Sequence, residues 1–244
     1  MMQGIYEITE NTPVVPAVYR LTLRGDVSAV TAPGQFINIA LSGRYLRRPI
    51  SVYDLNGDTL SVIYKTVGAG TEQLSRMRPG ERLDVLCGLG NGYVLSPAGE
   101  RPLLIGGGVG VPPLYLLARR LREAGKRTRV ILGFNREGEV FGEAEFAALG
   151  CEVTVTTADG SRGVKGFVTE AMTPGYTYIY ACGPEPMLKA VYKRSVTSGQ
   201  FSFERRMGCG FGACMGCSCK MVTGFKRICR EGPVLCKEEI LWEE

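Results

Sequence analysis

Five of the nine cysteines in this 244-residue chain lie within 22 residues, between Gly208 and Cys229. Three are closely spaced as Cys209-x₄-Cys214-x₂-Cys217, and Cys229 follows at a distance. This order is typical of plant-type [2Fe–2S] sites, in which four thiolates hold the two irons. The glycines interspersed among the cysteines allow backbone N–H groups to approach the sulfurs closely. The spacing therefore predicts iron–sulfur ligation by Cys209, Cys214, Cys217 and Cys229.

Other uses of a thiol cluster agree less well with the sequence. Four thiolates also make a structural zinc site, but zinc ligands usually come as two C-x₂₋₄-C pairs. Nine cysteines cannot all pair, and we see no secretion signal, so a disulfide framework is not expected. The chain has no histidine, which excludes Rieske-type ligation, Cys₂His₂ zinc and a histidine base. Zinc stays the alternative to iron–sulfur.

The remaining cysteines are expected to be bystanders. Cys219 follows Cys217 by two residues, so on an extended segment both side chains would face one way. We expect Cys219 to be a buried neighbour, with ligation in place of Cys217 as the alternative. Cys236 is similarly ambiguous beside Cys229. Two further cysteines are expected only to pack, Cys87 and Cys151.

Two segments could bind a flavin nucleotide. Arg47–Ser51 reads RRPIS, and an arginine and a serine on one strand can bind a pyrophosphate and a ring nitrogen. Lys65–Thr71 reads KTVGAGT, and its glycines open a predicted helix whose free N–H groups can hold phosphate. Either segment alone is also consistent with an ordinary strand or turn. Together, about 20 residues apart on a barrel, they favour a flavin site.

Two glycine-containing turns could bind a second dinucleotide. Ile105–Pro113 (IGGGVGVPP) lies between a predicted strand and a predicted helix, which suits a pyrophosphate, although it is not a G-x-G-x-x-G fingerprint. Ala181–Met187 (ACGPEPM) also follows a strand, at the edge where open α/β sheets bind ligands. Purely structural turns remain the alternative for both.

The elements that would position these motifs change in character near residue 100. Short alternating runs with intervening turns predict an antiparallel barrel whose strands are Val14–Leu23, Gln35–Leu41, Leu60–Tyr64 and Arg82–Leu86, with a helix at Thr71–Met77. Strands and helices then alternate, which predicts a parallel sheet. Its strands are Arg101–Ile105, Arg129–Phe134, Glu152–Thr157 and Tyr176–Ala181; its helices are Leu114–Ala124, Gly142–Leu149, Gly166–Met172 and Met187–Ser198. We therefore expect a β-barrel (1–98), an α/β domain (99–200) and a cluster lobe without a helix (201–244).

Composition restricts the class of protein. The net charge of +5 is modest and spread, so nucleic-acid binding is not expected. No apolar run is long enough to span a bilayer. Because we see no secretion signal, a cytoplasmic location is expected, where disulfides are rare.

The four motifs, in this order, resemble the ferredoxin–NAD(P)H reductase superfamily. The tail, CGFGACMGC followed by CREGPV, is similar to the electron-transfer subunits of class B dihydroorotate dehydrogenases. The resemblance implies an FAD-binding barrel, an NAD-binding α/β domain and a [2Fe–2S] lobe. It also implies an oxidoreductase subunit of pyrimidine biosynthesis that carries electrons from an FMN-containing, dihydroorotate-oxidising partner through the cluster and FAD to NAD⁺, in a heterotetramer with two copies of each.

The resemblance also implies particular site residues. The FAD would be bound by Arg48, Pro49, Ile50, Ser51, Ile63, Tyr64, Lys65, Gly70 and Thr71. The NAD would be bound by Gly107, Gly108, Gly110, Cys182, Gly183 and Pro184. No acid–base residue is implied, and Cys182 would lie near the nicotinamide.

Two alternative functions follow from the same residues. The first is the small FAD/[2Fe–2S] subunit of a bifurcating NADH–ferredoxin:NADP reductase or of a cytosolic hydrogenase. These subunits share all four motifs with the dihydroorotate dehydrogenase subunit and differ from it in their partner. A zinc-stabilised scaffold without redox chemistry is the alternative from another class.

Overall fold

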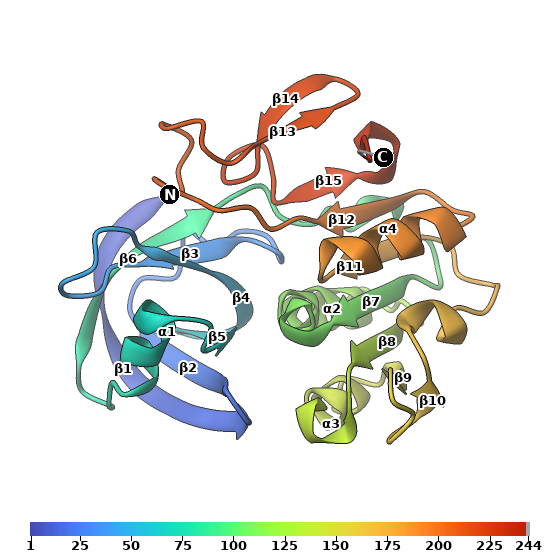
Figure 1. Cartoon of the computed structure of the whole chain (residues 1–244), viewed down its shortest axis with the longest axis horizontal. Helices are drawn as coiled ribbons and strands as arrows, with labels where there is room; N and C mark the ends of the chain where they lie inside the picture. The colour runs from blue at the N-terminus through green and yellow to red at the C-terminus, as the bar shows by residue number, and fades with distance from the viewer. Residues whose placement is uncertain (243–244) are drawn as a thin grey trace.

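The computed structural model describes residues 1–242 and contains a closed barrel, a seven-stranded sheet and a small hairpin. In Figure 1 the barrel lies on the left, the sheet with its helices on the right, and the C-terminal tail above both. No helix among the described residues has the length and apolar character needed to cross a membrane. The fold class predicted from the sequence, a β-barrel joined to an α/β domain and a C-terminal lobe, is confirmed.

The barrel is antiparallel, and its strands follow one another in the order β1-β2-β5-β4-β3-β6. Its elements are β1 (Met2–Val15), β2 (Val18–Arg24), β3 (Phe36–Ile39), β4 (Arg48–Asn56), β5 (Thr59–Lys65), β6 (Arg82–Leu89) and the helix α1 (Ala69–Ser75). Strand β1 pairs with both β2 and β6, which closes the barrel. Apolar side chains such as Ile37, Ile39 and Ile50 fill its interior.

One predicted strand was wrong. The run Val14–Leu23 is not a single strand, because the chain reverses at Pro16 and Ala17 and pairs Val15 with Val18. Proline cannot donate to a strand ladder, and Ala17 has a positive φ of 63°. The long strand β1 was missed because only two of its 14 residues are buried and its apolar alternation is weak.

The sheet has the order β10-β9-β8-β7-β11-β12-β15, and only its last pair is antiparallel. Its strands are β7 (Leu103–Gly107), β8 (Arg129–Phe134), β9 (Glu152–Thr157), β10 (Val164–Lys165), β11 (Ile179–Cys182), β12 (Gly199–Ser202) and β15 (Val234–Cys236). The α-helices of this region are α2 (Pro113–Glu123), α3 (Glu143–Ala148) and α4 (Glu185–Arg194). The predicted helix Gly166–Met172 was wrong, since only the 3₁₀ turn η4 (Val168–Ala171) forms there. Gly166, at a φ of 113°, and Pro174 leave too few residues between them for an α-helix.

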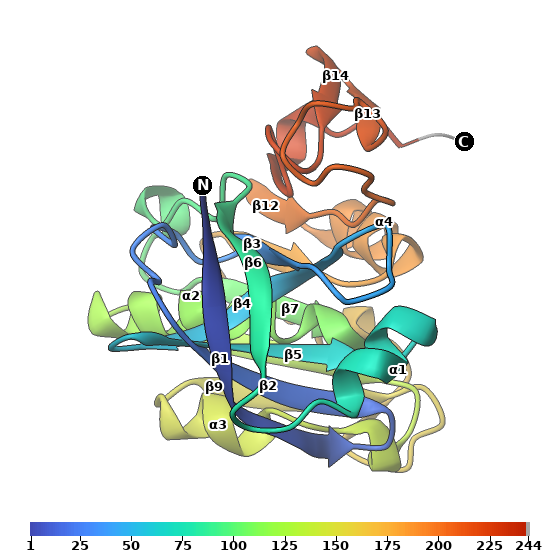
Figure 2. The ribbon, with the colours of Figure 1, turned by 90° about the vertical axis from the view of Figure 1, so that its left-hand side faces the viewer.

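The tail is built into both larger parts. Its hairpin consists of β13 (Ser218–Met221) and β14 (Gly224–Arg227), and β15 adds an antiparallel edge to the sheet. Figure 2 shows the hairpin projecting beyond the barrel and the sheet. The expected absence of an α-helix in the tail holds for its described residues, and its last two residues lie outside them. The domain boundaries remain a prediction, and β12 runs across the one at residue 200.

Candidate functional site

The first part of the cysteine loop folds around the sulfur of Cys209. The backbone nitrogens of Ala213 and Cys214 lie 3.2 and 3.4 Å from this sulfur, at hydrogen-bonding distance. The nitrogen of Cys209 in turn lies 3.5 Å from the sulfur of Cys214. A side chain on Gly208 would begin 3.2 Å from that same sulfur, so the glycine keeps the approach open. Cys209 and Cys214 therefore form one pair of thiols with N–H groups directed at them.

The second pair of thiols is buried. The sulfurs of Cys217 and Cys229 are 3.3 Å apart, and the nitrogen of Cys229 lies 3.4 Å from the sulfur of Cys217. Cys217 precedes β13 and Cys229 follows β14, so the hairpin is the element that brings them together. The gap of eleven residues in the sequence thus becomes a direct contact.

The donor set fits an iron–sulfur group, while the individual ligands remain a prediction. Within residues 1–242, no three cysteine or carboxylate side chains converge on one point as a ready metal site. Burial raises the pKa of Cys209, but N–H groups of Cys214, Phe211 and Ala213 outweigh it and lower that pKa to about 6. Thiolates stabilised by backbone N–H groups are the ligands that iron–sulfur clusters require.

Cys219 is occupied by another interaction. Its sulfur lies 3.0 Å from Nε of Arg205, and Arg205 also forms an ion pair with Glu185 at the start of α4. This arrangement agrees with the expected buried neighbour. Cys87 and Cys151 are buried in the barrel and beside the sheet, as expected. Cys236 is exposed on β15.

The proposed FAD residues on the barrel separate into two faces. On β4, Ile50 points into the barrel, while Pro49 is exposed and Ser51 half-buried on the outer side. Arg48 starts the strand and lies across the beginning of α1, where a Cβ on Gly70 would be 2.1 Å from its Nε. Thr71 closes the same turn, because its Oγ1 donates to the carbonyl of Gly68 at 3.0 Å.

The three proposed residues of β5 have different surroundings. Ile63 packs among side chains between the barrel and the sheet, while Lys65 is exposed. Tyr64 is buried in the barrel, and its hydroxyl lies 3.1 Å from Oδ1 of Asn11. Asn11 also donates to two carbonyls at the end of α1, so Tyr64 supports the helix. Its side chain is therefore part of the barrel core, which leaves its backbone for a flavin contact.

The two turns expected to bind NAD are in direct contact. They follow the neighbouring parallel strands β7 and β11, which places both at the carboxyl edge of the sheet. A Cβ on Gly110 would lie 2.4 Å from the carbonyl oxygen of Cys182, and one on Gly107 would lie 2.4 Å from the sulfur of Met187. Gly108 has a φ of 51° and open space beside it. Gly183 and Pro184 continue from Cys182 into α4.

Cys182 is a neutral thiol in this setting. Burial raises its pKa to about 12, and Glu204 acts in the same direction. A thiol is a strong nucleophile only when it is ionised, so Cys182 is a weak nucleophile near neutral pH, and its position beside the nicotinamide remains a prediction.

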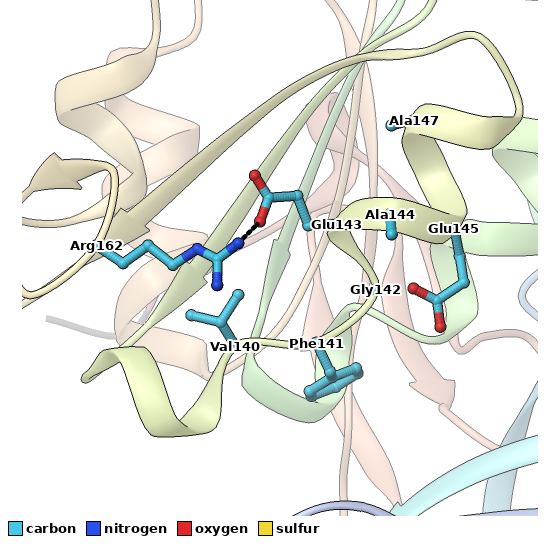
Figure 3. Close-up of a pocket in the computed structure, with 8 residues that line it drawn as sticks. All are labelled: Val140, Phe141, Gly142, Glu143, Ala144, Glu145, Ala147 and Arg162. Carbon is cyan, nitrogen blue, oxygen red and sulfur yellow. Dashed lines mark hydrogen bonds and ion pairs between the residues drawn. The ribbon is translucent and has the colours of Figure 1, made fainter.

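A hollow of about 480 Å³ lies farther along the sheet's carboxyl edge. It is lined by Val140, Phe141, Gly142, Glu143, Ala144, Glu145, Ala147 and Arg162. Figure 3 shows Arg162 reaching across to Glu143, with which it forms an ion pair, while Glu145 points elsewhere. None of the predicted site residues lines this hollow.

Sequence reasoning missed the residues that attach the cysteine loop to the barrel. Asn38 of β3 donates through Nδ2 to the carbonyl of Cys209 at 3.3 Å. Asn91, just after β6, donates to the carbonyls of Glu231 and Val234 near β15. The one available sequence signal for Asn38 was that it is a polar residue inside the mostly apolar run Gln35–Leu41.

The barrel joined to a mainly parallel α/β sheet has the architecture of a ferredoxin-reductase-like oxidoreductase, and a family match identifies its NAD-binding domain. Residues 104–193 match the family model of the oxidoreductase NAD-binding domain. Residues 204–241 match that of the iron–sulfur cluster binding domain of dihydroorotate dehydrogenase B.

Full-length relatives specify the family more narrowly. The chain is 42% identical to the "Dihydroorotate dehydrogenase B (NAD(+)), electron transfer subunit" of Geobacillus sp. (strain WCH70), over 99% of both chains. It is also 42% identical to the protein of that name from Fusobacterium nucleatum, over 96% of both. The chain belongs to the family of dihydroorotate dehydrogenase B electron transfer subunits.

Solved structures agree with this architecture. The structure of an NADH-dependent reduced ferredoxin-NADP oxidoreductase, described with flavin-based electron bifurcation, has a TM-score of 0.89 and 29% identity, over 98% of this chain and 90% of that one. A ferredoxin NADP⁺ reductase from Neisseria gonorrhoeae has a TM-score of 0.69 at 18% identity, over 80% and 90%, which shows the fold alone.

Proposed function

We propose that this chain passes electrons from a dihydroorotate-oxidising catalytic subunit through a [2Fe–2S] cluster and FAD to NAD⁺. The observation that carries the proposal is the position of the cysteine loop, which packs against the barrel through Asn38. The glycine turn at Gly108–Gly110 lies against β5, the strand of Ile63. The three proposed binding sites are thus adjacent within one body.

Each group of residues has a defined task. Arg48 and the turn at Gly70 and Thr71 would bind the FAD phosphates, and Pro49 and Ser51 would border the ring. When bound, FAD supplies the exchange between one-electron and two-electron carriers. The turns at Gly108 and Gly183 would bind NAD and exclude water from it. No side chain has to transfer a proton, which agrees with a chain that has no histidine.

The choice of NAD over NADP follows from charges in the hollow on α3. Ligands in open α/β sheets lie along the carboxyl edge of the strands, so the adenosine end of NAD would approach the ends of β8 and β9. Arg162 is the basic residue that lines the hollow there, and Glu143 already neutralises it. A 2′-phosphate in this hollow would meet a guanidinium that already has a carboxylate partner.

The proposal also specifies the partner subunit, its cofactor and the stoichiometry of the complex. Family membership implies a catalytic dihydroorotate dehydrogenase B subunit, and we infer that it contains FMN and forms a heterotetramer with two copies of each chain. The support for the FMN is chemical, since dihydroorotate gives up two electrons and the cluster accepts one at a time. A cytoplasmic location stays a prediction.

Co-purification tests the proposal. The chain, expressed with a candidate catalytic subunit, should yield a complex containing FAD, FMN and iron that reduces NAD⁺ with dihydroorotate. Zinc in place of iron, with no flavin absorbance, would instead establish the scaffold alternative. A complex without activity toward dihydroorotate would also contradict the proposal.

A second candidate is a subunit of a bifurcating NADH–ferredoxin:NADP reductase. The similarity to the solved reductase over 98% of this chain favours it. The identity of the co-purified partner separates the two, because a ferredoxin-active partner would replace the dihydroorotate-oxidising one.

A further inference from the structure

Asn38 occupies an unusual place for a polar side chain. It lies in the middle of the apolar strand β3 and is only 1% exposed. Its Nδ2 donates to the carbonyl oxygen of Cys209, 171 residues later in the chain. Its Oδ1 is buried and has no hydrogen-bond partner among the described residues. A buried polar group with half of its capacity unused is costly, so it calls for a functional reason.

The register of the barrel places Asn38 beside the proposed flavin strand. Asn38 lies directly opposite Pro49, and Phe36 lies opposite Ser51. Opposite residues of an antiparallel pair share one face of the sheet. Ile37 and Ile39 point into the barrel, so Asn38 shares the outer face with Pro49 and Ser51.

The cysteine loop meets that same outer face. A Cβ on Gly210 would lie 2.3 Å from Nδ2 of Asn38, so the loop backbone rests directly on the amide. The strand beneath is held in place, because Arg47 donates to the carbonyl of Asn38 at 3.3 Å and forms an ion pair with Asp84. Asn38 is thus in contact with the cysteine loop and adjacent to the proposed flavin strand.

We propose that Asn38 is a positioning residue for electron transfer, which fixes the Cys209 end of the cluster against the flavin-facing side of the barrel. The inference rests on the proposed function. In the complete complex, NADH would deliver two electrons to a bound flavin as hydride, and one of them would pass to a ferric iron of the cluster while the other stays with the flavin. Only the transfer from flavin to cluster passes between the barrel and the cysteine loop, which meet at Asn38. The rate of this transfer falls steeply as the distance between flavin and cluster increases.

The test separates these two transfers in the complete complex, mixed rapidly with NADH without oxygen. Asn38→Leu removes the amide at similar size. Gly210→Ala leaves Asn38 intact but pushes the loop away from it. We expect flavin reduction to change less than about twofold and cluster reduction to slow about fivefold or more, because the rate of electron transfer falls exponentially as the two groups are moved apart.

Gly224→Ala is the matched control. Gly224 lies in the hairpin of the same lobe with a positive φ of 109°, but a Cβ there would meet nothing within 4 Å. The strain of a side chain at a positive φ is therefore present without any contact to Asn38, and we expect cluster reduction within about twofold of wild type, because the cysteine loop keeps its place against the barrel.

The outcomes are distinct. Unchanged cluster reduction in Asn38→Leu and Gly210→Ala would overturn the inference. So would loss of iron from Asn38→Leu, because the amide would then be needed to build the loop and not to place it. A shifted electron paramagnetic resonance spectrum of the reduced cluster, with full iron content, would support it. A wild-type complex without flavin or cluster would instead refute the proposed function.

Discussion

Arg48 lies directly over Gly70, and a methyl group on Gly70 would be 2.1 Å from Nε of Arg48. The arginine starts strand β4 and the glycine lies in the first turn of α1, so their contact sets the shape of the proposed phosphate site. Ser75, at the other end of α1, donates from its Oγ to the carbonyl of Glu72 at 2.9 Å.

Gly70→Ala should therefore displace the guanidinium and weaken FAD binding by about 10- to 100-fold, because hydrogen bonds to a charged group contribute about 1.5–3 kcal/mol. Titration of the apoprotein with FAD, followed by flavin fluorescence, measures the change. Ser75→Ala is the control, because it changes the same helix at its other end, and it should bind FAD normally. Equal affinity of the two variants would show that Arg48 does not hold the phosphates.

Cys214→Ser should lose the cluster and retain FAD, because Cys214 forms one thiol pair with Cys209. Cys219→Ser should retain both groups, since its sulfur is occupied by Arg205 and lies outside the two pairs. Iron content and visible absorbance of the purified variants distinguish these results. Loss of iron from Cys219→Ser would mean that the ligand set was assigned to the wrong thiol.

Much of this site could be predicted because its signals are local. The spacing of Cys209, Cys214 and Cys217 lies within one loop, and the glycine turns directly follow buried strands. The contact between Asn38 and Cys209 could not be predicted, because it joins segments 171 residues apart through strand register. The same is true of β15, three residues whose partner strand is far away in the sequence. Tyr64 differs from these residues, since its side chain belongs to the barrel core and its expected flavin contact, still a prediction, would come from its backbone.

Cys182 should not titrate in the working range of the enzyme. Burial raises its pKa to about 12, so the thiol is neutral below that pH and ionises only above it. We expect the rate of flavin reduction by NADH to show no thiol ionisation between about pH 6 and 10, where unperturbed cysteines titrate at about 8.5. Cys182→Ala should leave the pH profile unchanged. A step near pH 8.5 that disappears in this variant would contradict the prediction.

Glu143→Gln should weaken the preference for NAD. The substitution leaves Arg162 without its carboxylate partner and makes it available to a 2′-phosphate. We expect the ratio of kcat/KM for NADH to that for NADPH to fall about 5- to 10-fold, since one freed charge–phosphate contact is worth about 1 kcal/mol or more.

Glu145→Gln is the matched control for this change. Glu145 lines the same hollow on the same helix, but it pairs with Arg20 of the barrel and points away from Arg162 (Figure 3). In Glu145→Gln, the ratio of kcat/KM for NADH to that for NADPH should stay at the wild-type value. If both variants shift equally, the effect comes from net charge and not from Arg162.

Strand β15 has a consequence for how this chain can be divided. It covers the edge of β12, and Asn91 ties it to the end of the barrel. An exposed edge strand is a template for intermolecular pairing. A shortened chain that ends before the cysteine loop would therefore tend to aggregate, even with its flavin and nicotinamide segments intact. For protein engineering, the cluster lobe cannot be replaced by another domain unless that domain also supplies a strand that pairs with β12.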